Sequence, residues 1–443
     1  MPWVLLAGIF QQSFWKFFPL KRFFSGPEFW DWITVVDLYV LLLIAVLLIG
    51  LVVGKIQFVV REIPWELAAG IVLILIAGVL EMLYQKTYTP ILSTPFLYFR
   101  SLFVLPIILV LLMVKTMEKD DLEKLTRQYL YMSGVFSFLA LIQYFSGIFP
   151  GERYDFMQRL SWPFIDFITL KATSANWAAF MVTPAAVIGL ARMGNRVKEQ
   201  KHKGLWSKEK CPGKCVLSLW KNFTDGTKAE LMVLVLSLAT LYLTQSYGAY
   251  AAVFGALTLY FFRLLPLKKF AAVLLMMLLL AGGVFLIQKN SYKFSVLSGE
   301  KQYRYENSAE SRKDIYMMNL QMIKDHPLLG VGLNQYQSYF ASTSEKTLGH
   351  KFNESHVPPH AHNFFLSMWL SLGILGLVGM LLVVAGALIR SKFAVINAAA
   401  FALTAMMIHG MIDSYYWKQE IAYLFWVVVI LAYATATDGK KNS

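Results

Sequence analysis

The chain has 443 residues, of which 57% are hydrophobic and only 15% are charged. Its mean hydropathy is +0.53, whereas about a quarter of the residues of an ordinary soluble domain are charged. This composition excludes a soluble globular protein and predicts a membrane protein. The formal net charge of +14 does not indicate nucleic acid, because Lys and Arg of membrane proteins gather in cytoplasmic loops and contact anionic lipids. We expect membrane lipids, and no nucleic acid, among the partners.

The N-terminal stretch and the two cysteines give only weak indications of function. The N-terminal stretch MPWVLLAGIFQQSFWKFF has neither the basic start nor the small-residue cleavage site of a signal peptide, and whether it spans the membrane stays open. Cys211 and Cys215 have only His202 nearby, so two reduced cytosolic thiols are favoured over a zinc site.

Apolar stretches long enough to cross a membrane recur along the chain, and we predict an all-α polytopic protein with 11 to 12 transmembrane helices. The stretch 231–262 is too long for one span and contains TQSYG, so it predicts two helices joined at residues 245–248. The other predicted spans are 34–53, 67–84, 96–114, 129–149, 172–193, 270–287, 364–388, 393–409 and 421–434.

Charge predicts the orientation of these helices. Ten Lys or Arg residues against three acidic ones lie between Arg192 and Lys228, which favours a cytoplasmic side for this segment. Successive loops alternate between the two sides of the membrane, so the remaining loops can be assigned from this one. The chain is then one integrated domain of three parts: an N-terminal bundle, 1–288, with a basic cytoplasmic loop, 193–230; a long external loop, 289–363; and C-terminal helices, 364–443. A loop of this length is typical of a functional segment.

The external loop contains a helical pattern. In SRKDIYMMNLQMIKDHP, the apolar residues Ile315, Met318 and Met322 recur at near-helical spacing, and His326 and Pro327 follow as a stop signal. We predict an amphipathic helix that lies over the membrane face.

Six of the seven histidines fall on or near the predicted outer face. They are either solvated loop residues or groups for base catalysis or metal binding. His360 and His362 are two positions apart, which suits a turn, and His362 adjoins Asn363 where the loop re-enters the membrane. Because no H-E-x-x-H motif occurs and no carboxylates cluster beside these histidines in sequence, we expect no metal.

Cations at the outer face are candidate phosphate ligands. Arg100 lies in the first turns of a predicted span, where an unpaired charge costs at least about 2.5 kcal/mol, so a partner or a water-filled cavity is implied. Snorkelling and phosphate binding both stay open for it. Lys171 precedes small residues that serve either substrate binding or helix packing. Asp413 either orients a histidine or caps the surface. Other outer-face arginines are Arg153, Arg159, Arg304 and Arg312.

The stretches MIKDHPLLGVGLNQY and HAHNFFLSMWLSLGILGLVG resemble the signature region of the O-antigen ligase and O-antigen polymerase superfamily of bacterial membrane enzymes. The resemblance is specific over residues 308–379. The stretches TSANWAAFMVTPA, LTQSYGAYAAV and HGMID support it more weakly.

This resemblance implies a GT-C-like helical fold and a glycosyltransferase of the bacterial cytoplasmic membrane. Such enzymes move a glycan from an undecaprenyl-diphosphate carrier to an acceptor hydroxyl of a glycan, lipid or protein at the outer face, without a cofactor or nucleotide sugar. By position, His362, Arg312 and Asp413 match the family's histidine, loop arginine and late aspartate. We assign His362, Arg312 and Asn363 to catalysis and Arg100, Lys171, Arg304, His360, Asp413 and Tyr247 to substrate binding.

One departure from the family's pattern concerns Tyr247. The chain reads SYGA where the family commonly has S-R-G-A, so a phosphate-binding arginine is missing. Either Arg100, Lys171, Arg304 or another outer cation replaces it, or the donor is held differently, or the protein has lost activity.

The resulting hypothesis makes His362 a general base on the acceptor hydroxyl, while Arg312 and a second cation hold the diphosphate. Turnover should then persist in chelator. Ligase and polymerase differ only in acceptor, and the sequence does not separate them. A lipid or glycan transporter and a structural scaffold are the alternatives from other classes.

Overall fold

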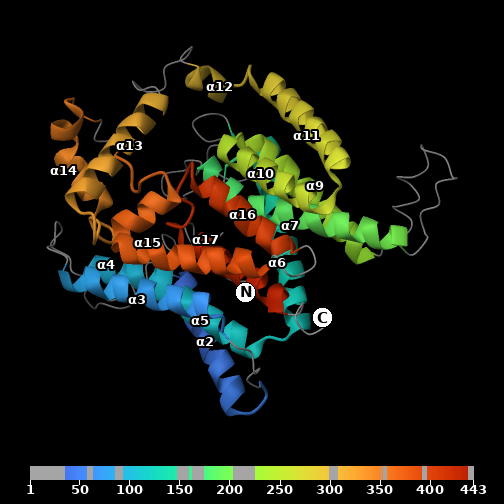
Figure 1. Cartoon of the computed structure of the whole chain (residues 1–443), viewed down its shortest axis with the longest axis horizontal. Coiled ribbons are helices and arrows are strands. Elements are labelled where there is room, and N and C mark those ends of the chain that lie inside the picture. Colours follow the sequence, from blue (N-terminus) through green and yellow to red (C-terminus); the bar gives the residue numbers. More distant parts are fainter. Residues whose placement is uncertain are drawn as a thin grey trace.

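The computed structural model describes residues 35–56, 63–84, 93–146, 159–161, 174–202, 225–298, 308–350, 352, 357–391 and 397–437. It is 84% helical, and within these ranges it contains no strand (Figure 1). The prediction of an all-α polytopic membrane protein is therefore confirmed.

The first half of the chain forms helices that closely follow the predicted spans. A π-helical turn at Arg100–Val104 separates α4 from α5. The helices are α2 (Val35–Val52), α3 (Trp65–Tyr84), α4 (Ser93–Phe99), α5 (Leu105–Thr116), α6 (Lys119–Ser146) and α7 (Ala175–His202).

The second half contains the predicted break and the predicted loop helix. The long apolar stretch is two helices, because α9 ends at Thr244 and α10 begins at Tyr247, with Gln245 in a left-handed conformation. The helices are α9 (Asp225–Thr244), α10 (Tyr247–Leu264), α11 (Leu267–Gln288), α12 (Tyr292–Leu297), α13 (Ser308–Asp325), α14 (Tyr336–Leu348), α15 (Phe364–Arg390), α16 (Ala398–Gly410) and α17 (Gln419–Thr437).

Six of the described helices are long and apolar enough to cross a membrane, namely α3, α6, α7, α9, α11 and α15. Shorter apolar helices lie at the predicted spans 34–53, 393–409 and 421–434. The total of 11 to 12 spans stays a prediction.

Two helices extend into segments that the sequence predicted as loops. α7 runs to His202, past the start of the predicted basic loop 193–230, and α6 begins at Lys119 in the charged KTMEKDDLEKLTR segment. The predicted spans were bounded by apolar length, so they did not give the ends of these helices, and the cytoplasmic loop stays a prediction. Opposite charges pair between these helix ends, so they remain helical beyond the apolar span: Arg192 lies 2.6 Å from Glu123 and 3.0 Å from Glu230.

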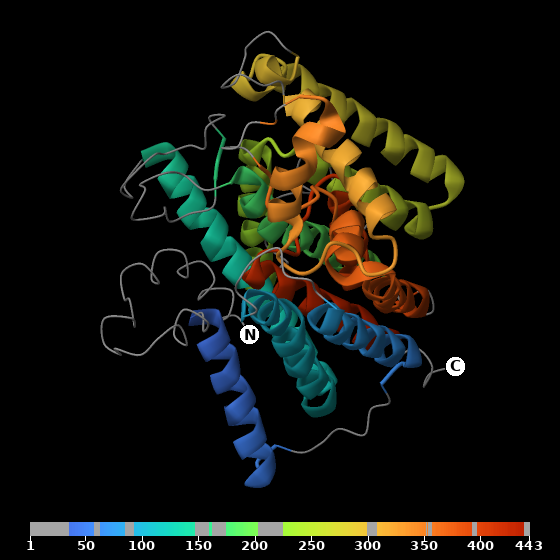
Figure 2. The same ribbon diagram turned by 90° about the vertical axis from the view of Figure 1, so that its left-hand side faces the viewer.

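The middle of the bundle is α17, whose residues from Ile421 to Tyr433 are all at most 5% exposed. α3 packs against α15 at a contact so close that a Cβ atom on Gly70 would lie 2.5 Å from the Gly379 carbonyl oxygen. Small residues allow such backbone approach between membrane helices. By contrast, α11 lies at the rim of the bundle, opposite α2 (Figures 1 and 2), and only 6% of its span is buried, so its apolar surface faces lipid.

The described part of the loop predicted to be external, which we call the external segment, has a small core of its own. The predicted amphipathic helix is α13, which ends at Asp325, and its residues Ile315, Met318 and Met322 are buried against Phe340 of α14. This confirms the helix and its stop signal at His326 and Pro327. Figure 1 shows α13 and α14 on one side of α15.

The LLGVG turn after α13 is fastened to a break in α15. Gly373 of α15 has φ 66°, and Gly330 of the turn has φ 76°. At this break, Val331 N donates to Leu370 O at 2.8 Å and Ile374 N donates to Leu328 O at 2.9 Å. Only glycine fits, since a Cβ atom at either position would lie within 2.5 Å of a backbone oxygen. The turn therefore folds the external segment back onto the membrane helices.

Candidate functional site

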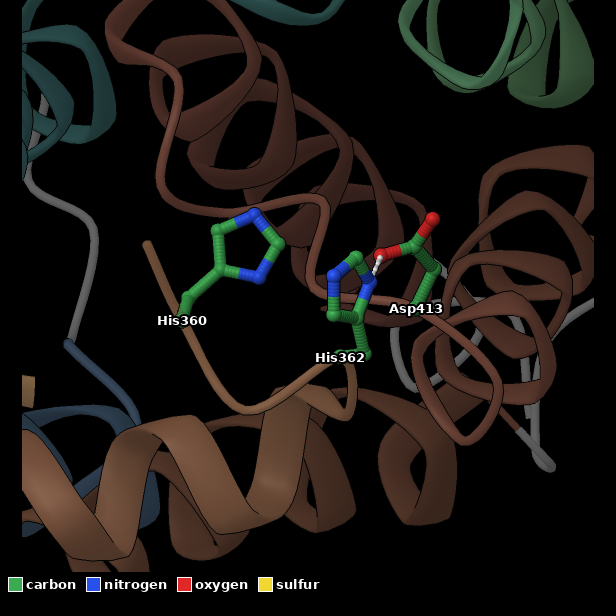
Figure 3. Close-up of side chains that lie close together, drawn as sticks. All are labelled: His360, His362 and Asp413. Atoms are coloured by element: carbon green, nitrogen blue, oxygen red, sulfur yellow. Dashed lines mark hydrogen bonds and ion pairs between the residues drawn. The ribbon is translucent and has the colours of Figure 1, made fainter. Parts of the chain in front are cut away.

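The centre of the site is an ion pair between two segments that are far apart in sequence. His362 lies at the end of the segment 357–363 that leads into α15, and Asp413 lies in the turn between α16 and α17. Their Nδ1 and Oδ1 atoms are 3.0 Å apart, and Figure 3 shows the imidazole directed at the carboxylate. His362 has φ 48°. A non-glycine residue with such a positive φ has a strained backbone, and such residues are typical of functional sites.

The carboxylate of Asp413 is buried and well hydrogen-bonded. Asn176 at the start of α7 donates to Oδ2 at 2.7 Å, and the amide of Ser414 donates to Oδ1 at 2.8 Å. Burial acts to raise the pKa of Asp413, but the charge and hydrogen bond of His362 and the charge of Arg312 hold this pKa well below its usual range. An ionised carboxylate only accepts, so His362 donates from Nδ1, and in the neutral imidazole the lone pair is on Nε2. The side chain of His362 is 28% exposed, so substrate can reach this base.

His360 stands beside His362, with the two ring centroids 4.8 Å apart (Figure 3). Burial, together with the charge of His362, lowers the pKa of His360 to about 4. Its ring is therefore neutral at pH 7, and it does not compete with His362 for a proton.

A metal ion must be considered, because ligand atoms of His360, His362 and Asp413 all lie within 4.8 Å of one another. The expectation that no carboxylate clusters around these histidines is wrong, since Asp413 is 51 positions away in sequence and was invisible to a search by spacing. The donor set of two imidazoles and a carboxylate suits a transition metal. Yet Oδ1 and Oδ2 already accept three hydrogen bonds, and the charge of Arg312 opposes a cation. A His–Asp pair that orients a base fits this geometry better than a metal centre.

One face of α13 holds the histidine segment in place. Arg312, Tyr316 and Asn319 follow at i, i+4 and i+7 and so share this face. Asn319 Nδ2 donates to the carbonyl oxygen of Ala361 at 2.9 Å, and the Tyr316 hydroxyl donates to that of His362 at 3.4 Å. Arg312 lies one turn before Tyr316 and acts electrostatically on Asp413. The amphipathic helix thus brings its arginine to the His362–Asp413 pair.

Asn363 has a structural position. It is the N-cap of α15, with its Oδ1 accepting from Leu366 N at 3.1 Å, and its Nδ2 donates to Met411 O at 2.9 Å. Both ends of the amide are engaged, so Asn363 braces the loop that carries His362 against the turn that carries Asp413. Its assignment to catalysis stays a prediction.

Near Tyr247 the structure places two cations. Lys293 lies over the Tyr247 ring, 4.2 Å from its centroid, and donates to the carbonyl oxygen of Gln245. Arg159 is buried and acts electrostatically on Tyr247. Lys293 and Arg312 both act electrostatically on buried His409, whose carbonyl oxygen accepts from the amide of Asp413. Sequence spacing gave no signal for Lys293, which lies 46 positions after Tyr247.

Arg100 has a partner, as its place in a membrane helix implied. Its guanidinium lies 2.7 Å from the carboxylate of Asp37, which is fully buried and also accepts from Gln419 at 2.5 Å. This pairing gives Arg100 a role in joining α2, the π-helical turn and α17. Lys171, Arg304, Arg153 and His356 lie outside the described residues.

Comparison with known families bears on this site. Residues 232–381 match the O-antigen ligase family model. The match supports the O-antigen ligase and polymerase superfamily for this chain. It covers Tyr247, Lys293, Arg312 and His362 and ends before Asp413. A search of curated proteins finds no match. The matched family suggests a glycosyltransferase-type enzyme and implies a lipid-linked glycan substrate in general.

Proposed function

We propose that the protein is a metal-independent glycosyltransferase of the bacterial cytoplasmic membrane. It moves a glycan from an undecaprenyl-diphosphate carrier to an acceptor hydroxyl at the outer face, on a GT-C-like helical scaffold. The observation that carries this proposal is the His362–Asp413 pair, whose geometry leaves one imidazole nitrogen free to accept a proton.

The proposed reaction is a single displacement at the anomeric carbon. The acceptor oxygen forms the new glycosidic bond while its proton passes to Nε2 of His362, and the bond between the anomeric carbon and the diphosphate oxygen breaks. Undecaprenyl diphosphate leaves with the bonding electrons. Asp413 stabilises the imidazolium that forms, as a buried carboxylate does in other His-based catalysts.

Arg312 and Lys293 are the proposed partners of the diphosphate. Two cations that act on the same buried group, His409, can neutralise the charge that develops on the leaving group. Lys293 thereby supplies beside Tyr247 the positive charge that the side chain of Tyr247 lacks. Arg100 is held by Asp37, and roles for Lys171 and Arg304 in donor binding stay predictions.

The test uses purified full-length protein with undecaprenyl-diphosphate oligosaccharide and host envelope extract, and follows release of undecaprenyl diphosphate. We expect His362→Ala to lower the rate by about 10²–10⁴-fold, the usual contribution of a general base. His350→Ala is the matched control, because His350 also contacts an aspartate, Asp314, at 3.1 Å but lies exposed at the end of α14. Equal rates for the two variants would refute His362 as the base. Loss of turnover in chelator would refute the metal-independent mechanism.

The acceptor is the point at which ligase and polymerase differ. In the same assay, transfer of preassembled chains in single steps onto a lipid, protein or wall glycan indicates a ligase. A ladder of lengthening chains on the carrier lipid indicates a polymerase. We propose the ligase as the first reading and the polymerase as its alternative, since the chemistry at His362 is the same for both.

A further inference from the structure

A cavity of about 280 Å³ lies beside His360, between the external segment and the membrane helices. Its wall comes from α4, the first turns of α7 and α14, the segments before α14 and α15, α15 itself and the turn before α17. Such a place, where a loop segment covers a helix bundle, is typical of ligand sites. We call it the Trp417 cavity.

The wall of the Trp417 cavity mixes aromatic rings with hydroxyl groups. Trp177 and Trp417 are its indoles, and Ser367, Ser371 and Ser414 are among its polar residues. Lys418 lies in the wall with its Nζ 4.3 Å from the centroid of the Trp177 ring and 2.7 Å from Glu420. The charge of Lys418 is thus neutralised within the protein, so the cavity is polar without a strong net charge.

Two polar atoms of wall residues lack an ordinary partner. Within the described part of the chain, the indole Nε1 of Trp417 and the Nδ1 of His360 are buried without a hydrogen bond. A buried donor without a partner costs about 1–3 kcal/mol, so such atoms point to a missing ligand.

These features fit one class of ligand. A sugar ring has an apolar face that packs on aromatic rings and a rim of hydroxyls that exchange hydrogen bonds with serine, indole and imidazole groups. An acyl or isoprenoid chain would leave the Trp417 indole N–H and the Nδ1 of His360 without a partner. A diphosphate would find no unneutralised cation among these wall residues, since the ammonium of Lys418 is paired with Glu420.

The cavity also adjoins the proposed catalytic base. His360 belongs to its wall, and the centroid of the His360 ring is 4.8 Å from that of His362. A sugar in the cavity therefore lies next to His360, whose ring neighbours that of His362.

We infer that the Trp417 cavity is a subsite for a sugar ring of a glycan substrate, and that it presents this sugar to His362. This inference rests on the proposed glycosyltransferase function. The same ring chemistry can come from the glycan of the donor or from that of the acceptor, and the experiment separates these sources.

The test measures binding without turnover. Full-length protein is equilibrated by dialysis with two radiolabelled, lipid-free probes: the oligosaccharide released from the carrier, and the glycan of the host acceptor. Trp417→Phe keeps the ring and removes the indole N–H, and Ser371→Ala removes one hydroxyl. We expect each to weaken binding of one probe by roughly three- to tenfold, the value of one hydrogen bond. Trp65→Phe is the matched control, because Trp65 is 64% exposed at the start of α3.

Each outcome decides something. Weaker binding of the carrier-derived probe identifies a donor subsite, and weaker binding of the other probe identifies an acceptor subsite. If both cavity variants bind both probes as Trp65→Phe does, or if the wild type binds neither probe, the inference is overturned. Probe binding by a wild-type protein that releases no lipid diphosphate would leave the cavity standing and refute the proposed function instead.

Discussion

Two charged clusters lie near opposite ends of α7, and they are built on different principles. Asn176, in the first turn, contacts Asp413, whereas Arg192 lies sixteen residues later, about 24 Å along the helix axis. At the Arg192 end, the guanidinium bridges Glu123 and Glu230, and Arg196 approaches Glu230 at 2.9 Å. We call these groups the Arg192 cluster, and Asp413 with His362, Arg312 and Lys293 the Asp413 cluster.

The difference lies in how the charges balance. In the Arg192 cluster, two carboxylates face three arginines, counting Arg127, and each carboxylate contacts at least two of them. Its members satisfy one another and tie α6, α7 and α9 together. In the Asp413 cluster, Asp413 accepts hydrogen bonds from His362 and Asn176, and Arg312 and Lys293 both act electrostatically on the neighbouring His409. The first arrangement suits stability, and the second suits an anionic substrate next to a base.

The largest effect that separates the clusters is expected from Asp413→Asn. An amide can donate to Nδ1 of His362, which favours the tautomer with its proton on Nε2 and removes the free lone pair. The rate of lipid diphosphate release should fall by about 10²–10⁴-fold, as for loss of the base itself, while folding is retained. Release assays check the rate, and size-exclusion profiles check that the variant is folded.

Asp314→Asn is the control for this variant, since Asp314 also contacts a histidine but at an exposed position. Activity in Asp413→Asn equal to that of Asp314→Asn would show that Asp413 only supports the fold, and would remove the contrast between the two clusters.

The Arg192 cluster should respond in stability and not in chemistry. Arg192→Met leaves Glu230, which is 3% exposed, with Arg196 as its remaining close partner, so the cost should lie below the about 3–5 kcal/mol of a buried charge that loses its partner altogether. We expect a clear drop in the thermal unfolding midpoint. At a temperature where the variant is folded, its rate should equal that of the wild type. A lower rate with unchanged stability would mean that the cluster takes part in the reaction.

The sequence predicted most of the helices and the residues of the histidine segment, because apolar length and loop chemistry are local properties. It predicted α13 from the spacing of Ile315, Met318 and Met322, and the structure confirms it. It did not predict that α7 continues past residue 193, because the ion pairs of Arg192 join three helices. Nor did it bring Asp413 to His362 or Lys293 to Tyr247, since these contacts depend on how the helices pack. For the same reason, Asn176, Tyr316 and Asn319 were not recognised as members of the site, although Asn319 shares a helical face with Arg312.

A smaller effect is expected where the external segment is fastened to α15. Gly373→Ala forces an L-residue into a backbone conformation of φ 66° and ψ −172°, which is essentially restricted to glycine and costs about 1–3 kcal/mol, and it places a Cβ atom 2.3 Å from Leu328 O. The external segment should loosen, so proteolysis between α13 and α14 should accelerate and the release rate should fall. Gly283→Ala in α11 is the control, because a Cβ there meets nothing within 4 Å. Equal proteolysis of both variants would show that the break in α15 does not hold the segment.

The smallest effect concerns acid. Because the pKa of His360 is lowered to about 4 in the folded protein, against about 6.5 in an unfolded chain, the unfolded state takes up a proton first as pH falls. Stability should therefore decline between pH 6.5 and about 4 and be independent of His360 above that range. His360→Gln should flatten this part of the profile of unfolding midpoint against pH, whereas His350→Gln should not. Solvent near the partly exposed ring screens the charge, so the effect stays below those of the preceding variants. If His360→Gln and the wild type lose stability in parallel as pH falls, the lowered pKa of His360 does not cause this loss. Another titratable group then causes it.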